Sequence, residues 1–485
     1  MDPKKLPFLK DSPYMPQDVS LVIVNFNGRH HLEDCLTSVY ESSFRNFEVL
    51  MVDNGSRDQS CEYVAREFPR VKILPLDYNS GFSVANNLAV RQAGGDLLAF
   101  LNNDVEVETS WLEALVQEAE KDKSSVAFAS KMKLFDVRKV LNGVGGAMNR
   151  IGYTWDRGMF EPDHGQYDQP EEVFFACAGA CLIRKKAYAA AGGMDEDFFM
   201  YHEDVDLCWT LWQQGGRIRT VPQAVVYHKF GGTSLHTMGA ERREYIGERN
   251  NIRSLIKHYE LPNLARALAS LLRMGQSPGR KWILLRNFAW NIRNLPRSLA
   301  ERKKVQSTRV ARDRELSRLI DPRTRVPLVL PDYPIASAAS FLSTKRVVRQ
   351  VAMEENEIGC LSYGWYPLEM NPSGRGKRVR WTQQEASLFL CGGNAPGRLQ
   401  LKIYTMGATS GVPAEGTVYL NGIRAGHFSF NRDGWEEFFV EVRHSDLCLE
   451  VVIRLEKTWS PDRIFRNGDR RELGVALQKI CWESA

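Results

Sequence analysis

The chain has 485 residues, a formal net charge of +5, 43% hydrophobic residues and 25% charged residues. This composition excludes a mainly disordered chain, and the length allows two or three domains. Nine cysteines without a CxxC pair favour reduced thiols over a disulfide framework or a zinc site. No apolar run reaches the roughly 18 residues that a membrane-spanning helix needs.

The start of the chain and the distribution of charge bear on location. Lys4 and Lys5 are not followed by a continuous apolar stretch, so the start does not resemble a secretion signal and we expect a cytoplasmic protein. Residues 261–330 carry 16 Lys and Arg against 4 Asp and Glu, a charge of +12, so the rest of the chain sums to −7. The basic character therefore belongs to one segment.

Strands and helices alternate through the first hundred residues. Apolar runs at 19–24, 47–52, 71–76 and 97–101 predict four buried strands, and apolar residues at helical spacing lie between them. This alternation predicts an α/β fold with a parallel, doubly wound sheet.

Polar residues stand just after each predicted strand. Asn25 and Asn27 follow the first, Asp53 the second, Asn79 the third and Asp104 the fourth. The gaps from Asn25 to Asp53, from Asp53 to Asn79 and from Asn79 to Asp104 are 28, 26 and 25 residues. Because the carboxyl ends of parallel strands share one edge, where ligands of such sheets bind, the spacing predicts one polar cluster.

The chemistry of this cluster excludes some ligands and favours others. The turn after the first strand, VNFNGRHH, has one glycine, Gly28, and the chain has no GxxxxGK[ST] motif, so a simple nicotinamide or ATP site is disfavoured. Amides and carboxylates suit the edges of a base and the hydroxyls of sugars. Asp104 is the candidate ligand for a divalent cation, and His228, which also ends a predicted strand, is a candidate nitrogen ligand that Mn²⁺ accepts. Taken singly, an Asp after a strand is more often a turn or cap, and a lone His is seldom a ligand.

Residues 110–260 continue as mixed α/β structure, with NGVGGAMNRIG (142–152) expected to be a turn. In MYHEDVDLCWT, Glu203, Asp204 and Asp206 open a helix. Acids favour helix N-termini, which is the structural explanation. The preceding FFMY favours partial burial, and burial next to like charges raises a carboxyl pKa, as a general base requires.

Beyond residue 260 the pattern changes twice. Residues 261–330 read as basic helices with aromatic residues, which suits either an anionic membrane surface or a solvated helix packed on the first domain. Residues 321–334 resemble a boundary, and short strands after about residue 345 predict an all-β sandwich without a chemical constellation. Four aromatic residues there could stack on sugars but are expected to be core: Trp365, Tyr366, Trp381 and Trp435.

Six stretches in a fixed order carry a resemblance to family 2 glycosyltransferases with a GT-A fold, especially bacterial rhamnosyltransferase-like enzymes of surface-polysaccharide and O-antigen assembly. It covers roughly residues 18–260, and the stretches are VSLVIVNFNGRHHLEDCLTSV, VLMVDNGSRDQS, NSGFSVANNLAV, LLAFLNNDVEV, FMYHEDVDLCWT and VVYHKFGGTS. The β-sandwich resembles modules appended to bacterial glycan-assembly enzymes, for which we expect glycan binding or self-association.

The resemblance implies roles for individual residues. Asp53, with Asn25 and Asn27 nearby, looks like the group that reads the nucleotide base. Asp204, preceded by Glu203, matches the catalytic base of an inverting enzyme. The remaining matches are the nucleotide-sugar loop (Asn79, Gly81, Phe82 and Asn86), the amides at the position of the family's DxD motif (Asn102 and Asn103) and the ligands of Mg²⁺ or Mn²⁺ (Asp104 and His228). Asn102 departs from the DxD pattern, which puts the strength of metal use in doubt.

The expected organisation is therefore a GT-A domain at 18–260, a basic helical linker at 261–344 and a β-sandwich at 345–485. The expected function is an inverting, metal-dependent transfer from a nucleotide-diphospho-sugar to a hydroxyl of a lipid-linked or polysaccharide acceptor. The alternative is a non-catalytic glycan- or nucleotide-binding scaffold. Nucleic acid is not an expected partner, a homo-oligomer stays open, and the expected location is cytoplasmic or peripheral at the inner face of the cytoplasmic membrane.

Overall fold

The computed structural model describes most of the chain. Described are residues 18–229, 239–274, 278–324, 326, 333, 335–343, 347–370, 372, 378–391, 396–442, 448–467 and 469–484. Lys4, Lys5, the GGTS stretch at 231–234 and much of the expected boundary at 321–334 lie outside them. The chain divides into two compact units, one of Met1–Met159 with Asp163–Pro327 and one of Phe160–Pro162 with Leu328–Ala485.

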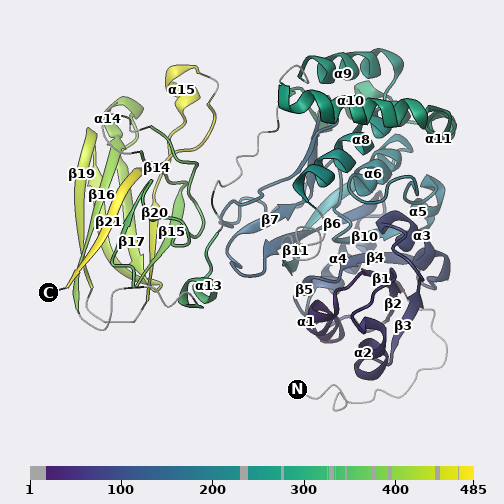
Figure 1. Ribbon diagram of the computed structural model, residues 1–485, viewed down its shortest axis with the longest axis horizontal. Helices are drawn as coiled ribbons and strands as arrows, with labels where there is room; N and C mark the ends of the chain where they lie inside the picture. The colour runs from purple at the N-terminus through teal and green to yellow at the C-terminus, as the bar shows by residue number, and fades with distance from the viewer. Residues whose placement is uncertain are drawn as a thin grey trace. The chain divides into compact units, whose positions relative to one another are not determined.

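A nine-stranded mixed sheet forms the centre of the first unit (Figure 1). Its strand order is β3-β2-β1-β4-β10-β6-β11-β5, with β7 paired to β6. The first four strands run parallel, which confirms the predicted α/β class, and β10 then pairs antiparallel with β4. The strands are β1 (Val19–Asn25), β2 (Phe47–Asp53), β3 (Val71–Pro75), β4 (Leu97–Asn102), β5 (Val105–Val107), β6 (Ser125–Leu134), β7 (Leu141–Val144), β10 (Ala180–Arg184) and β11 (Arg217–His228).

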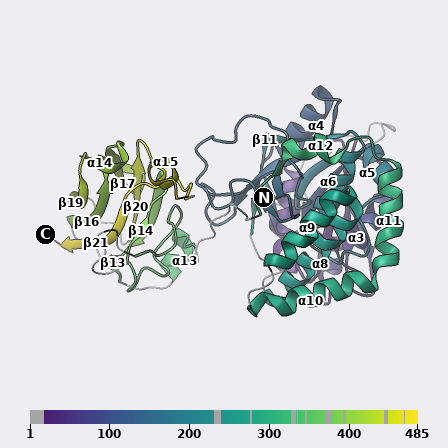
Figure 2. The ribbon, with the colours of Figure 1, turned by 90° about the horizontal axis from the view of Figure 1, so that it is seen from above.

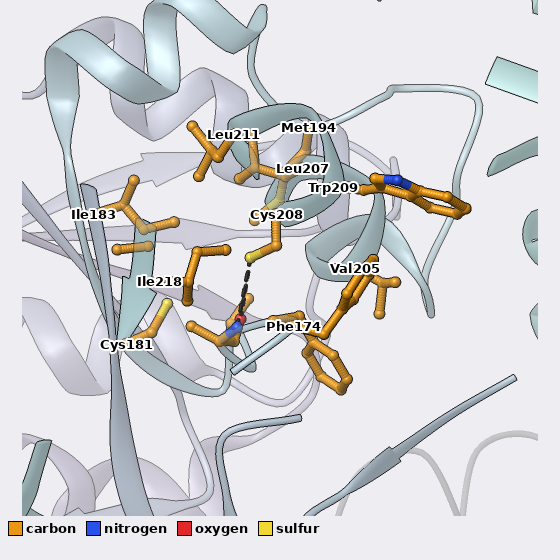
Figure 3. Close-up of a cluster of buried hydrophobic side chains, with 14 of the residues drawn as sticks. Phe174, Cys181, Ile183, Met194, Val205, Leu207, Cys208, Trp209, Leu211 and Ile218 are labelled. Carbon is orange, nitrogen blue, oxygen red and sulfur yellow. Dashed lines mark hydrogen bonds between the residues drawn. The ribbon is translucent and has the colours of Figure 1, made fainter. Parts of the chain in front are cut away.

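Helices cover both faces of this sheet and bury its apolar side chains in two clusters. One cluster includes the inner face of α6, where Trp209 is fully buried and Cys208 lies within 3.9 Å of the Ala176 carbonyl oxygen (Figure 3). This packing fixes the start of α6, which carries the acidic residues. The helices on the sheet are α1 (Arg29–Tyr40), α2 (Ser60–Glu67), α3 (Phe82–Gln92), α4 (Trp111–Lys121), α5 (Lys185–Ala191) and α6 (Glu203–Gln213).

The segment at 142–152 is not the expected turn. It contributes to β7 and forms β8 (Gly146–Asn149), which belongs to a small sheet with β9 (Thr154–Asp156) and β12 (Ile320–Asp321). Its glycines do not break the strands because neighbouring groups fill the space of the absent side chains. A Cβ atom on Gly146 would lie 1.9 Å from the Phe175 ring.

Further helices complete the first unit and confirm that the basic segment is helical. They are α8 (Ala240–His258), α9 (Leu261–Met274), α10 (Pro278–Arg293), α11 (Leu295–Ser307), α12 (Asp313–Leu316) and a 3-10 turn (Ser317–Leu319). Figure 2 looks onto the layer formed by α8 to α11. In the described parts of the chain, no helix combines the length and hydrophobicity needed to cross a bilayer.

The second unit consists mainly of two antiparallel sheets with two apolar clusters, as the strand pattern predicts an all-β domain. Trp365, Tyr366 and Trp381 are buried, in agreement with the core interpretation, while Trp435 is half-buried against Tyr404. The first sheet has β13 (Gln350–Ala352), β14 (Arg380–Trp381), β16 (Gly397–Met406), β19 (Asp433–Val442) and β21 (Ala476–Ser484). The second has β15 (Glu385–Leu390), β17 (Ala414–Leu420), β18 (Ile423–Phe430) and β20 (Leu449–Leu455), and the short helices are α13 (Ala338–Ser343), α14 (Gly407–Ser410) and α15 (Pro461–Phe465).

Candidate functional site

The ends of β1, β2 and β4 are joined through one buried amide. Asn25 lies opposite Asp53 in the parallel register of β1 and β2, and it is fully buried. Its Nδ2 donates to Asp53 Oδ1 at 2.9 Å, and its Oδ1 accepts from Asn103 Nδ2 at 2.7 Å. Asn25 and Asn103 therefore hold the sheet edge in place, and the predicted polar cluster does form.

The loop after β2 is shaped by the other oxygen of Asp53. Asp53 Oδ2 accepts from the backbone N–H of Ser56 at 3.0 Å. Asn27, which has a left-handed φ of 50°, donates its own N–H to Ser56 Oγ and accepts from the N–H of Arg57. Gly28 leaves room for this arrangement, because a Cβ there would lie 2.0 Å from Asn103 Nδ2.

The loop at 79–86 is tied both to β2 and to the approach to α6. Asn54 Nδ2 donates to Asn79 Oδ1 at 3.0 Å, and Asn79 Oδ1 also accepts from the N–H of Gly81. The N–H of Phe82 donates to the Phe199 carbonyl at 2.6 Å. The side chain of Asn86 is buried and donates back to the Phe82 carbonyl at 2.9 Å. This loop thus links the expected nucleotide end to the segment before Glu203.

Asp104 and His228 meet although 124 residues separate them in the sequence. Strand β5 pairs antiparallel with β11, which sets His228 opposite Val105, and the N–H of Lys229 donates to the Asp104 carbonyl at 2.9 Å. His228 Nε2 lies 3.3 Å from Asp104 Oδ1. The sheet topology therefore brings the two predicted metal ligands together.

The ligand atoms that Asp104 and His228 offer fit a divalent cation. Asp104 Oδ1 is buried and has no hydrogen-bond partner among the residues that the structure describes. Asn142 Oδ1 lies 2.5 Å from His228 Nδ1, and if it accepts the Nδ1 proton, the lone pair of Nε2 faces Asp104. Two ligands at right angles on an ion with bonds of roughly 2.1 Å would be about 3 Å apart, close to the observed spacing.

Asp104 and His228 supply only part of a coordination shell. Among the described residues, no group of three or more His, Cys, Asp and Glu side chains could hold a metal ion. Mg²⁺ and Mn²⁺ are commonly bound by one or two protein ligands together with substrate phosphates and water. The site thus fits a cation that arrives with a diphosphate.

The two asparagines before Asp104 have separate positions. Asn103 is buried and bonded to Asn25, whereas Asn102 is half-buried, and its side chain borders Gly179. Its backbone N–H donates to the Gly179 carbonyl at 2.9 Å. Of the two amides, only that of Asn102 lies at the side of the site that borders the acidic pair.

Glu203 and Asp204 form a coupled acidic pair at the start of α6. Burial, followed by the charge of Asp204, raises the pKa of Glu203 to about 8. Burial also raises the pKa of Asp204, opposed by hydrogen bonds from the N–H groups of Ala178 and Val205. Because these donors stabilise the ionised form of Asp204, we assign the negative charge to Asp204 and the shared proton to Glu203.

Asp206, the third acid, has a structural position. Its carboxylate accepts from Lys257 Nζ at 2.6 Å and lies 2.9 Å from His258 Nε2 and from Ser254 Oγ. Burial alone would raise the pKa of Asp206, but Lys257 and His258 outweigh it and hold the pKa low. Asp206 therefore anchors α6 to α8.

Two residues that the sequence did not single out border the site. Burial, with a smaller contribution from Asp204, raises the pKa of Asp156 to about 7, while His228 acts in the opposite direction, so Asp156 lies within electrostatic reach of both groups. His31 is buried on α1 within electrostatic reach of Asp104, and in the described part of the chain neither of its ring nitrogens has a hydrogen-bond partner. Neither residue follows a recognisable motif, and only the folded chain brings them to the site.

Part of the first unit is similar to known proteins. Residues 20–192 match the family described as Glycosyl transferase family 2. The N-acetylglucosaminyl-diphospho-decaprenol L-rhamnosyltransferase of Mycobacterium tuberculosis is 28% identical over 253 residues, which cover 48% of this chain and 81% of that protein.

Other known proteins are also similar to this chain. The O-antigen biosynthesis protein RfbC of Myxococcus xanthus is 28% identical over 238 residues, which cover 47% of this chain and 18% of that protein. Among solved structures, GalNAc-T7 with UDP, GalNAc and Mn²⁺ is similar with a TM-score of 0.44 and 18% identity, covering 59% of this chain and 57% of that one.

Proposed function

We propose that this chain, whose residues 20–192 match the model of glycosyl transferase family 2, transfers a sugar from a nucleotide-diphospho-sugar to a hydroxyl group of a bacterial surface glycan with inversion at the anomeric carbon. One observation carries the proposal. Asn102, next to the Asp104 region, donates its N–H to the Gly179 carbonyl, and the adjacent Ala178 donates its N–H to Asp204 Oδ2 at 3.2 Å. The candidate diphosphate end and the candidate base thus lie at two ends of one hydrogen-bonded segment.

The residues of the site have different roles in the proposed reaction. Asp53 and Asn25 hold the loop that would receive the base, and Asn79 with Gly81 shapes the loop over the donor. Asp104 and His228 would hold Mg²⁺ or Mn²⁺, and such an ion would neutralise charge on the departing diphosphate. The nitrogen ligand favours Mn²⁺ over Mg²⁺.

Asp204 is the proposed general base. Its carboxylate would take the proton of the acceptor hydroxyl while the new bond to the anomeric carbon forms and the bond to the diphosphate breaks. Glu203 carries its own proton at neutral pH, so it adds no second charge next to Asp204. A single displacement of this kind needs no covalent intermediate and inverts the configuration.

The proposed acceptor is lipid-linked or a growing polysaccharide. The mycobacterial relative is named for transfer of L-rhamnose to N-acetylglucosaminyl-diphospho-decaprenol. The protein from Myxococcus xanthus is named for O-antigen biosynthesis. An acceptor of this class would require a place for a polyprenyl chain near the acidic pair.

A panel of nucleotide-diphospho-sugars tests the proposal. The purified chain is incubated with each donor, a glycan acceptor and Mg²⁺ or Mn²⁺, and nucleoside diphosphate release is measured. We expect release with one donor, and an anomeric signal in the NMR spectrum of the product that shows inversion. Donor binding without release across the panel would favour the non-catalytic scaffold, and retention of configuration would exclude single displacement.

A further inference from the structure

On helix α10, two amide side chains face α8 and several large apolar side chains face outward. Asn287 and Asn291 are buried, and their Nδ2 atoms donate to Glu248 Oε2 and to the Arg249 carbonyl, both at 3.0 Å and both on α8. On the opposite side, Trp282 is 74% exposed and Ile292 is 69% exposed. A surface helix of a globular protein normally shows the reverse arrangement.

The exposed apolar residues of α10 share one face. Trp282, Leu285, Ala289 and Ile292 are spaced three, four and three residues apart and are all exposed. The other aromatic side chains of the segment are less exposed, and Arg249 of α8 lies over the Trp290 ring at 4.6 Å. The helix thus separates aromatic residues used for packing from those presented outward.

The neighbouring helices extend this surface. Leu272 of α9 is 54% exposed, and Leu299 of α11 is 49% exposed. Figure 1 shows α9 and α10 on the outer side of α8, away from the sheet, and both helices contact α8. We call the outward sides of α9, α10 and α11 the outer helical face, marked by Leu272, Trp282, Leu285, Ile292, Leu295 and Leu299.

The positive charge of residues 261–300 indicates which kind of partner the outer helical face binds. Between residues 261 and 300 the sequence has seven Lys and Arg and no Asp or Glu. Lys281, Arg286 and Arg293 are exposed on α10 beside the apolar row. Apolar side chains that reach the acyl boundary, flanked by cations that meet lipid phosphates, are typical of helices lying in a membrane interface.

We propose that the outer helical face docks on an anionic lipid bilayer, with α9 to α11 lying in the plane of the interface. Trp282 and Ile292 enter the headgroup region, while Lys281 and Arg293 contact lipid phosphates. Apolar burial and charge attraction then act together, so binding weakens when either is removed.

Helix α8 connects this surface to the segment that carries the proposed base. Asn250 of α8 donates its Nδ2 to the carbonyls of Met200 and Tyr201 at 3.0 and 2.8 Å, just before Glu203 and Asp204. The thickness of α10 and of α8, about 20 Å together, therefore separates the outer helical face from the segment that carries the acidic pair. The inference rests on the proposed function and extends its lipid-linked acceptor, because docking would bring the protein to the bilayer that holds the polyprenyl chain.

Vesicle flotation of the full chain tests the proposal. We expect binding to vesicles of equimolar phosphatidylglycerol and phosphatidylcholine at low salt, and loss of binding to phosphatidylcholine alone. Ile292→Glu should weaken binding at least about tenfold and Arg293→Gln about fivefold. The controls are Ile423→Glu, at a second isoleucine that is 69% exposed, and Arg424→Gln, both on β18 of the other unit and both expected to bind as the unaltered chain does.

Several results would overturn the proposal. They are failure of the unaltered chain to float with anionic vesicles, equal binding by Ile292→Glu, and equal loss in Ile423→Glu. A dimer in solution that Ile292→Glu dissociates, without vesicle binding, would assign the face to a second copy. If Ile292→Glu lowers the melting temperature, Trp282→Ser replaces it. Release of nucleoside diphosphate with a soluble acceptor should be unchanged in Ile292→Glu, so a failure of docking is distinguishable from a failure of the proposed transfer.

Discussion

Replacing Glu203 by Gln should remove a pH dependence from the stability of the first unit. The pKa of Glu203 is raised from its ordinary value of 4.5 to about 8, by burial and then by Asp204. At neutral pH the folded chain therefore holds a proton on Glu203 that the unfolded chain has released. Gln has nearly the shape of the protonated acid and does not titrate, so the change leaves Asp204 and the packing in place.

The size and sign of this pH dependence follow from the pKa values of Glu203 in the unfolded and the folded chain. Between pH 4.5 and 8 the folded state binds one more proton than the unfolded state, so the free energy of unfolding falls by about 1.4 kcal/mol for each pH unit. The contribution of neutral Glu203 is complete below pH 4.5 and is lost as the pH rises through 8. Over this pH range the free energy of unfolding falls by at most about 5 kcal/mol. Part of this loss belongs to Asp204, because the two carboxyl groups titrate together.

Urea unfolding followed by tryptophan fluorescence, repeated from pH 5 to pH 8, measures this difference. The unaltered chain should lose stability with rising pH relative to Glu203→Gln. Glu120→Gln, an exposed position on α4, is the matched control and should keep the slope of the unaltered chain. The same slope in Glu203→Gln and in the unaltered chain would refute the assignment of the proton to Glu203.

Three further changes test the rest of the site. Gly28→Ala should lower the free energy of unfolding by about 1–3 kcal/mol, because its Cβ would lie 2.0 Å from Asn103 Nδ2. Gly247→Ala is the control and should not lower it, because no described atom beyond its own stretch of α8 lies within 4 Å of its Cβ. Equal melting curves for the two variants would contradict the predicted clash at Gly28. Asp206→Asn should cost about 3–5 kcal/mol by leaving Lys257 and His258 without their carboxylate, and an unchanged melting temperature would argue against that anchor. Asp104→Ala should weaken Mn²⁺ binding in the presence of nucleoside diphosphate at least about tenfold, measured as free Mn²⁺ by electron paramagnetic resonance, and equal affinity would exclude Asp104 as a ligand.

The polar edge of the sheet was predictable because it depends on local features of the sequence, the apolar runs and the polar residues that follow them. Each apolar run forms a strand, and the polar residue that ends it must lie at the carboxyl edge of a parallel sheet, as Asn25 and Asp53 do. The approach of His228 to Asp104 depends on β5 pairing with β11, a long-range contact that the residues themselves do not encode. The position of His228 at the end of a predicted strand made it a candidate ligand beside Asp104, and the family resemblance supported the pairing.

Other features depend on packing and could not be read from periodicity. The three acids of α6 are indistinguishable in sequence, yet Lys257 and His258 make Asp206 an anchor and leave Glu203 with Asp204. The glycines at 142–152 look like a turn because the residues that fill their space, such as Phe175, lie elsewhere in the chain. Along α10, the sequence left open which side packs on the first domain, and only the structure shows that Asn287 and Asn291 are buried there.

The central claim is that Asp204 removes the proton from the acceptor. The most direct measurement compares Asp204→Asn with the unaltered chain, using the donor found in the panel, for both the rate of nucleoside diphosphate release and the affinity for the donor. A positioned general base contributes about 10²–10⁴-fold, so we expect the rate to fall by that factor while the dissociation constant of the donor is unchanged. Turnover by Asp204→Asn at the rate of the unaltered chain would contradict the account.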